Sequence, residues 1–199
     1  MSAQHGATVR HARREDVPHI LSLIHDLAAY EKEPPSTVEA TAESLAATVA
    51  FAPSDPTSTT TSMHTLRTAD ASSILPDTEP ITPSRPARCL LLFPRGADEP
   101  AGMALYFYNY STWRARAGIY LEDLFVREGQ RGRGFGTRLL VALAREVVAM
   151  EGGRLEWSVL KWNEPSIKFY EGLGARMMSE WVGMRVDGEA LVKLAATQI

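Results

Sequence analysis

Features that mark several common protein classes are scarce or missing in this chain. Its single cysteine, Cys89, cannot form an intrachain disulfide, so nothing points to the secretory pathway. No stretch approaches the roughly 18 apolar residues that a membrane-spanning helix needs. The formal net charge of -3 lacks the basic surplus of a dedicated nucleic-acid-binding protein. The five histidines show no metal-ligand spacing, and therefore no metal is expected.

The amino-terminal segment is basic and has no acid before Glu15, a composition that a mitochondrial transit peptide would also have. The run "ATVRHA" (7–12) is instead typical of a short strand that leads into a capped helix. We favour this second interpretation, and we expect a cytoplasmic protein, with the nucleus as a further compartment.

The composition predicts one globular domain over residues 7–196. Hydrophobic residues make up 45% of the 199 residues, enough to form a full core. Residues 52–87 interrupt this domain with Pro, Ser and Thr and with hardly any apolar periodicity. Such a segment cannot offset the entropy of ordering, so a disordered spacer is predicted, with a phosphorylated regulatory loop as the alternative.

Hydrophobic periodicity predicts the order of the elements. Helices are expected over 16–30, 37–51 and 136–150, and a short one in "NEPSIKFYEGLG", capped by Asn163. Strands are expected in "ATVRHA", in the hairpin "RCLLLFPR" and "AGMALYFYNYSTW", in "GIYLEDLFV" and "RLEWSVL", and once or twice in the tail, before a final turn. This order predicts an α/β fold of the mixed α+β kind.

The segment "RGRGFG" (131–136), between a strand and a helix, is the first candidate site. The P-loop pattern needs Gly-Lys-Ser/Thr, and the dinucleotide fingerprint needs G-x-G-x-x-G, so neither fits G-x-G-x-G. Glycines let the backbone approach a ligand, and the following helix presents free N–H groups to an anion. Arg131, Arg133 and Arg138 add positive charge, so the pattern favours a pyrophosphate over a turn with incidental arginines.

Together with three further segments, this loop resembles the GCN5-related N-acetyltransferases (GNAT superfamily). Arg131 to Gly136 match the R-x-x-G-x-G/A loop of that family. "YLEDLFV", "WNEPSIKFYEGLGA" and "DGEALVKLA" resemble its diamine branch, the spermidine/spermine N1-acetyltransferases and their thialysine-acetylating relatives. The likeness covers residues 9–51 and 88–196. It implies the GNAT fold, a mostly antiparallel twisted sheet flanked by helices, with acetyl-CoA as co-substrate, a small-molecule amine as acceptor, and a homodimer.

The resemblance also implies roles for individual residues. The backbone of one strand is expected to pair with the pantetheine arm at Leu124, Phe125 and Val126. The pyrophosphate is expected on the loop that comprises Arg131, Gly132, Arg133, Gly134, Phe135, Gly136 and Thr137. Further contacts to acetyl-CoA are expected from Asn163, Pro165, Ser166 and Tyr170. The acceptor cleft corresponds to Tyr30, Glu31, Trp113, Glu122 and Glu156. Glu180 is not assigned to it, because the tail is shorter than in the spermidine enzymes.

The chemistry expected from these residues is a direct acyl transfer in a ternary complex. Glu122 is the candidate base, and Tyr170 is the candidate acid that protonates the departing thiolate. Strand alternation predicts Asp123 on the opposite face, as a structural ion-pair partner. An N–H near Phe125 is expected to polarise the carbonyl. Acids near the cleft favour a polyamine, a diamine or a lysine analogue; a protein lysine or amino-terminal acetyltransferase and a non-catalytic acetyl-CoA sensor remain the alternatives.

Overall fold

The computed structural model describes residues 6–54 and 76–198, and the chain divides into two compact units, Met1–Ser158 and Val159–Ile199. Each unit is described by itself. Within the described residues, no helix is both long enough and apolar enough to cross a membrane.

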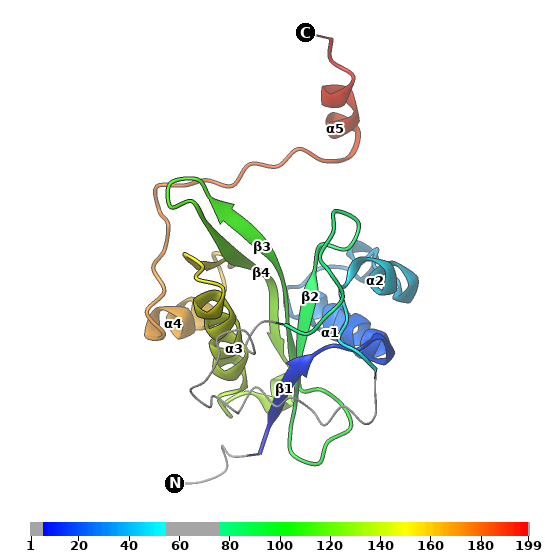
Figure 1. Cartoon of the computed structure of the whole chain (residues 1–199), viewed down its shortest axis with the longest axis vertical. Coiled ribbons are helices and arrows are strands. Elements are labelled where there is room, and N and C mark those ends of the chain that lie inside the picture. Colours follow the sequence, from blue (N-terminus) through cyan, green and yellow to red (C-terminus); the bar gives the residue numbers. More distant parts are fainter. Residues whose placement is uncertain (1–5, 55–75, 199) are drawn as a thin grey trace. The chain divides into compact units, whose positions relative to one another are not determined.

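A five-stranded sheet forms the centre of the first unit (Figure 1). Its strands follow the chain in the order β1-β2-β3-β4-β5, and they comprise Thr8–His11, Arg88–Phe93, Gly102–Ser111, Arg116–Val126 and Leu155–Trp157. The first three pairings are antiparallel and the β4–β5 pairing is parallel. The predicted hairpin and the mostly antiparallel sheet are therefore confirmed.

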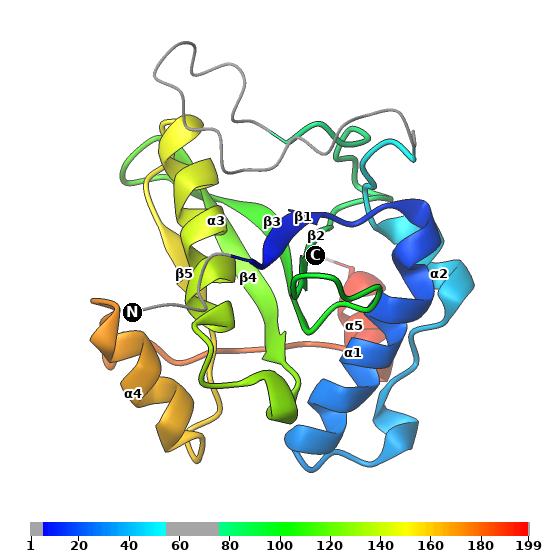
Figure 2. The ribbon, with the colours of Figure 1, turned by 90° about the horizontal axis from the view of Figure 1, so that it is seen from below.

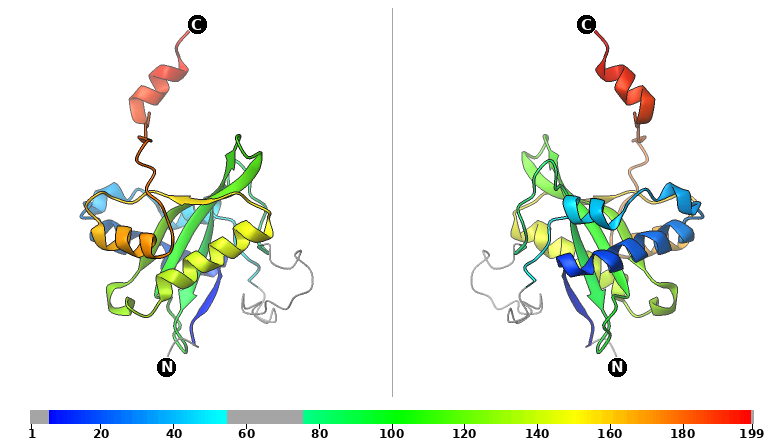
Figure 3. Two further views of the ribbon diagram at one scale, coloured as in Figure 1. Left: turned by 90° about the vertical axis from the view of Figure 1, so that its left-hand side faces the viewer. Right: turned by 90° about the vertical axis from the view of Figure 1, so that its right-hand side faces the viewer.

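Helices cover both faces of this sheet. α1 (Val17–Tyr30) and α2 (Ala42–Thr48) lie on one face and α3 (Phe135–Ala149) on the other (Figure 2). The side views agree, because α3 is in front of the sheet in one and α1 in the other (Figure 3). Short 3-10 helices occur at Arg14–Asp16, Pro35–Thr37 and Glu128–Gln130.

The predicted helix over 37–51 is wrong at both ends. Thr41 accepts a hydrogen bond from the Ser44 N–H, so the helix α2 begins after this N-cap. At the other end, Val49 has extended backbone and forms an isolated parallel bridge with Ala87. The Ala-rich composition is compatible with a longer helix, but these local bonds confine it to two turns.

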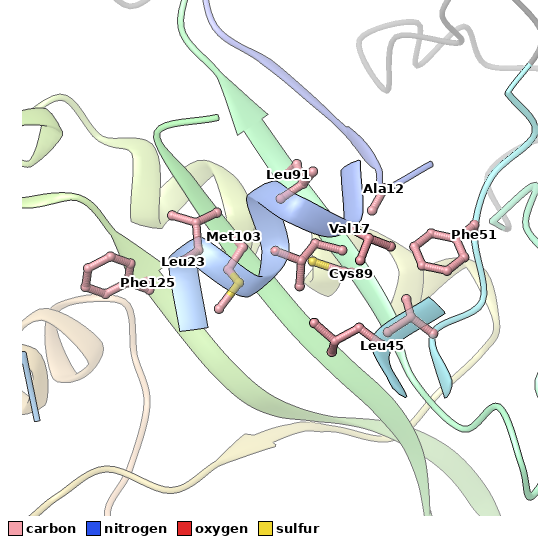
Figure 4. Packing of buried hydrophobic residues seen from close by; sticks show 11 residues of the cluster. Ala12, Val17, Leu23, Leu45, Phe51, Cys89, Leu91, Met103 and Phe125 are labelled. Carbon is pink, nitrogen blue, oxygen red and sulfur yellow. The ribbon is translucent and has the colours of Figure 1, made fainter. Parts of the chain in front are cut away.

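The hydrophobic core beneath α1 joins side chains from distant parts of the sequence (Figure 4). Val17 and Leu23 of α1 pack with Leu91 and Met103 of the sheet and with Phe51 after α2. Cys89 is fully buried in the same cluster, and burial raises the pKa of its thiol. The only cysteine is therefore a packing residue.

A buried polar network joins the other face of the sheet to α3. The fully buried Glu146 accepts hydrogen bonds from the hydroxyls of Tyr106 and Tyr108. Arg88 donates to Tyr108, and His11 Nε2 lies 2.9 Å from the Tyr106 hydroxyl. Burial, and secondarily the charge of Arg88, lowers the pKa of His11 to about 3, so this histidine is neutral at physiological pH.

The predicted insertion 52–87 is held at its ends by specific contacts. The Glu79 carboxylate accepts from the Phe51 N–H at 3.1 Å and from Arg14 Nη2 at 2.8 Å. The Glu79 N–H in turn donates to the Phe51 carbonyl. Residues 55–75 lie outside the described residues, so the predicted disorder stays a prediction there.

The second unit contains α4 (Glu164–Gly172) and α5 (Gly188–Ala195). The predicted short helix is confirmed, and Asn163 caps it by accepting from the Ser166 N–H. The predicted tail strands are wrong, because the described tail has no strand and α5 lies where they were expected. The apolar residues of this helix recur at the helical period instead of alternating.

Candidate active site

Residues 131–136, the glycine-arginine loop, follow β4 and lead into α3, and they contain two glycines with left-handed backbone conformation. Gly132 has φ 75° and Gly134 has φ 72°, a conformation that L-residues with a side chain rarely adopt. A Cβ atom at either position would have no neighbour within 4 Å. Glycine is therefore required by the backbone conformation alone, and the space above the loop is open to a ligand.

The loop ends in a helix start that has no side-chain cap. Gly134 is the N-cap of α3, and the first N–H of the helix that bonds within it is that of Arg138. The preceding N–H groups are therefore available for an anion, and the helix dipole favours negative charge there. The side chain of Phe135 is buried in the core, so only its backbone N–H can face an anion at this helix start.

The three arginines of the loop differ in what they contact. Arg131 Nε donates to the Val126 carbonyl at 2.9 Å, and Arg138 Nη1 donates to the Ala7 carbonyl at 3.0 Å. Arg133 is exposed and has no hydrogen bond or ion pair with any described residue. Of the three guanidinium groups that the sequence suggested, only that of Arg133 is uncommitted within the described part of the chain.

The parallel pairing of β4 with β5 is short. It covers Ile119 to Leu121, where Leu121 pairs with Trp157, the last residue of β5. Beyond that point, residues 122–126 of β4 have no described partner strand on this side. The backbone of β4 therefore has an open edge at the stretch predicted to pair with pantetheine.

The direction of the β4 backbone groups follows from one hydrogen bond. Arg127 N donates across β3 to Ala101 O at 2.9 Å, and in an antiparallel ladder every second residue faces the same neighbour. Phe125 therefore uses its N–H and C=O towards β3, whereas Leu124 and Val126 direct theirs to the open edge. An N–H near Phe125 was expected to polarise the thioester carbonyl. At the open edge, the N–H that is available for this role is that of Leu124.

A β-bulge interrupts the β3–β4 ladder at the acidic pair. Leu105 pairs with Asp123 and Tyr106 pairs with Leu121, so Glu122 has no partner of its own on β3. A bulge inserts one residue and resets the alternation of side chains after it.

The bulge turns both carboxylates to the same face of the sheet. Tyr106 faces α3, where its hydroxyl bonds Glu146, while Leu105 packs against the core beneath α1. Cross-strand partners share a face, so Asp123 lies with Leu105 on the α1 face. Glu122 lies there too, because it follows a residue that faces α3. The prediction that Asp123 points to the opposite face is wrong, since the alternation on which it relied is broken here.

Asp123 titrates unusually as a result. Burial, followed by the charges of Glu122 and Glu31, raises its pKa from 3.8 to about 6. Burial and the neighbouring Glu33 also raise the pKa of Glu31. None of Glu31, Glu122 and Asp123 forms an ion pair with a described Lys or Arg, so the predicted structural ion pair of Asp123 is wrong. The three form a carboxylate cluster suited to a cationic ligand.

Tyr30 joins this cluster from the end of α1. Its ring lies 6.5 Å from that of Phe125 and 4.5 Å beneath the Arg131 guanidinium. The structure thus brings together Tyr30, Glu31, Glu122 and the glycine-arginine loop, as the sequence predicted, and adds Asp123.

Two other predicted acceptor residues are placed differently. Trp113 lies in the β3–β4 turn with 89% of its surface exposed, and the seven residues from Arg116 to Glu122 alone span roughly 20 Å of strand. Glu156 is bound within the sheet, to Arg154 at 2.7 Å and to Asn109 at 2.6 Å. Trp113 is thus remote from the carboxylate cluster of its own chain, and Glu156 is engaged by Arg154 and Asn109.

The remaining candidates belong to the second unit. Asn163 caps α4, Pro165 and Ser166 lie in its first turn, and Tyr170 follows in its second half. The Tyr170 ring packs against that of Phe169 at 5.3 Å. Their predicted roles towards acetyl-CoA stay predictions.

Comparison with known proteins points to one family. The model described as the Acetyltransferase (GNAT) family matches residues 60–175. Thialysine N-epsilon-acetyltransferase of Bos taurus is 33% identical over 190 residues, which cover 94% of this chain and 96% of that protein. L-ornithine N5-acetyltransferase NATA1 of Arabidopsis thaliana is 46% identical over 91 residues, which cover 46% of this chain and 40% of that protein.

A solved structure shows the same fold. The crystal structure of an aminoglycoside acetyltransferase from an uncultured soil metagenomic sample matches 92% of this chain and 97% of its own, with a TM-score of 0.63. At 11% sequence identity, this likeness concerns the fold alone.

Proposed function

Because this chain belongs to the acetyltransferase (GNAT) family and is an N-acetyltransferase, we propose that its acceptor is a small primary amine with a cationic chain. Acetyl-CoA is the co-substrate of the family. The observation that carries the choice of acceptor is the carboxylate cluster of Glu31, Glu122 and Asp123, which has no described cationic partner. The relatives named for thialysine and ornithine, both small amines, support the same class.

The first step is removal of a proton from the acceptor. An alkylammonium with a pKa of about 10.4 is almost wholly protonated at pH 7, so forming the neutral, nucleophilic amine costs about 4–5 kcal/mol of free energy. A carboxylate with a pKa near 6 is better matched to accept this proton than an ordinary one. We therefore assign the base to Asp123 and the binding of the cation to Glu122 and Glu31.

The donor is held by the loop and by the open edge of β4. The free N–H groups at the start of α3, with Arg133 beside them, suit the pyrophosphate of acetyl-CoA. The backbone groups of Leu124 and the N–H of Val126 at the open edge suit the amides of the pantetheine arm, while the Val126 carbonyl already accepts from Arg131. The Leu124 N–H is the candidate donor to the thioester oxygen, whose charge grows in the transition state.

Transfer is direct. The neutral amine attacks the thioester carbonyl carbon, the new C–N bond forms, and the C–S bond breaks. Asp123 holds the proton taken from the ammonium before the attack. The departing thiolate takes a proton that we assign to the hydroxyl of Tyr170, and the second proton, which the nitrogen loses when the C–N bond forms, restores that hydroxyl. An acyl-enzyme on Cys89 has no support, because that thiol is buried and its pKa is raised.

The test is CoA release from acetyl-CoA against spermidine, putrescine, thialysine, ornithine and a lysine-containing peptide. Turnover with small amines, and a loss of about 100-fold or more in Asp123→Asn, is the expected result. Turnover with the peptide alone would favour a protein acetyltransferase. Binding of acetyl-CoA in calorimetry without turnover of any amine would contradict the proposal and favour a sensor.

We further propose a homodimer, on the resemblance to the diamine branch. Sedimentation equilibrium at micromolar concentration should give twice the chain mass of 21.9 kDa. A monomer at that concentration would refute this assignment without touching the chemistry.

A further inference from the structure

Arg131 occupies a position in the loop where a pyrophosphate ligand is expected, yet its guanidinium lies over two aromatic rings. It lies 4.5 Å from the centre of the Tyr30 ring and 5.7 Å from that of Phe125. Its Nε is engaged with the Val126 carbonyl at 2.9 Å. The side chain is therefore fixed on one edge by a hydrogen bond and on its face by two aromatic rings.

This arrangement depends on the shape of arginine and not only on its charge. A planar guanidinium can stack on a ring and donate from Nε at the same time, whereas a lysine ammonium is a point charge that can do only one of these. A residue that served the pyrophosphate by charge would not need either contact.

The rings under Arg131 belong to the acceptor side of the site. Tyr30 is the last residue of α1, and Glu31 of the carboxylate cluster follows it directly. Arg127 fixes the preceding turns of α1 through Asp26 and Ser22, each at 3.0 Å. At the end of the helix, Arg131 of the loop contacts Tyr30.

We propose that Arg131 is a positioning residue for the acceptor amine, which holds Tyr30 and Glu31 against β4, and not a ligand of the acetyl-CoA pyrophosphate. This inference rests on the proposed function in one respect, namely that the carboxylate cluster binds the acceptor. The two arginines of the loop then have separate roles, because Arg133 serves the donor and Arg131 serves the acceptor.

The experiment compares Arg131→Ala, Arg131→Lys and Arg133→Ala. For both Arg131 variants we expect the amine KM to rise roughly two- to fivefold, the range for a cation over an aromatic ring at an exposed site. The Kd of acetyl-CoA, from calorimetry, should stay within twofold. Arg133→Ala should show the reverse pattern. Failure of lysine to restore the amine KM separates stacking from charge.

A double-mutant cycle with Tyr30→Leu gives a second readout. If Arg131 acts through Tyr30, the effects of Arg131→Lys and Tyr30→Leu on the amine KM should not add. If Arg131→Ala fails to fold, Arg131→Lys and Tyr30→Leu still test the inference. Additive effects, rescue by lysine, or a tenfold loss of acetyl-CoA affinity in Arg131→Lys would each overturn the inference.

The outcome remains distinct from that of the proposed function. If the wild-type enzyme acetylates no small amine, the proposed function is wrong, and the KM comparison would use the acceptor that is acetylated instead. Calorimetry with acetyl-CoA alone still decides whether Arg131 is a pyrophosphate ligand, because it requires no acceptor.

Discussion

Replacing Asp123 by asparagine should make the protein more stable and less active. In the folded state, burial and two neighbouring carboxylates raise the pKa of Asp123 from 3.8 to about 6. The folded protein therefore binds this proton more tightly than the unfolded chain does. The contribution of Asp123 to the free energy of unfolding is therefore most favourable at low pH, where the carboxyl is protonated in both states. This contribution falls as the pH rises from about 4 to about 6 and stays low above that range.

The size of the effect follows from the shift. About two pKa units correspond to about 3 kcal/mol of lost stability at pH 8, and linkage reduces this to about 1 kcal/mol at pH 4.5. Asparagine is close in shape and cannot ionise, so the variant should avoid the loss. At roughly 2–4 °C per kcal/mol for a chain of this size, we expect a gain in Tm of about 6–12 °C at pH 8.

The assay is urea unfolding at pH 4.5, 6 and 8 for the wild type, Asp123→Asn and the control Glu128→Gln, an exposed carboxylate after β4. The difference between wild type and Asp123→Asn should grow with pH, and the control should show no such growth. Activity with a small amine should fall about 100-fold in Asp123→Asn alone. A variant that is equally stable or less stable at pH 8 would refute the reasoning.

Four further variants have expected outcomes. Tyr170→Phe should lower kcat and leave the Kd of acetyl-CoA nearly unchanged; equal kcat would remove this hydroxyl from the chemistry. Gly134→Ala should cost about 1–2 kcal/mol in urea unfolding because of its positive φ, and should weaken acetyl-CoA binding in calorimetry. Deleting residues 55–75 should leave Tm almost unchanged, whereas Glu79→Ala should lower stability by about 1–2 kcal/mol, because the Phe51 N–H loses its acceptor.

Periodicity predicted the regular elements well where packing and local preference agree. The helix expected over 136–150 is found at Phe135–Ala149, and the hairpin strands are found where apolar runs are bounded by turn residues. The prediction over 37–51 failed because a cap at Thr41 and a bridge at Val49 override alanine's helix propensity. Local hydrogen bonds of this kind leave little trace in composition.

The site was predictable in its residues but not in its geometry. The loop glycines and the acids Glu31 and Glu122 of the carboxylate cluster stood out in the sequence as parts of motifs. The face on which Asp123 lies was predicted wrongly because strand alternation was assumed to continue through "LED", and a bulge depends on the partner strand. Likewise, the stacking of Arg131 on Tyr30 joins residues that are about 100 positions apart, which no local pattern can reveal.

The bulge at Glu122 also bears on how such a site could arise or be transplanted. A regular ladder with the same sequence would direct Asp123 towards the side that holds Tyr106 and Glu146, and would bury it among acceptors and aromatic rings. Copying the residue identities onto a flat designed strand would thus reproduce the motif without its chemistry. Conversely, inserting one residue at this point of a regular strand would bring a second carboxylate to the face that holds Glu31.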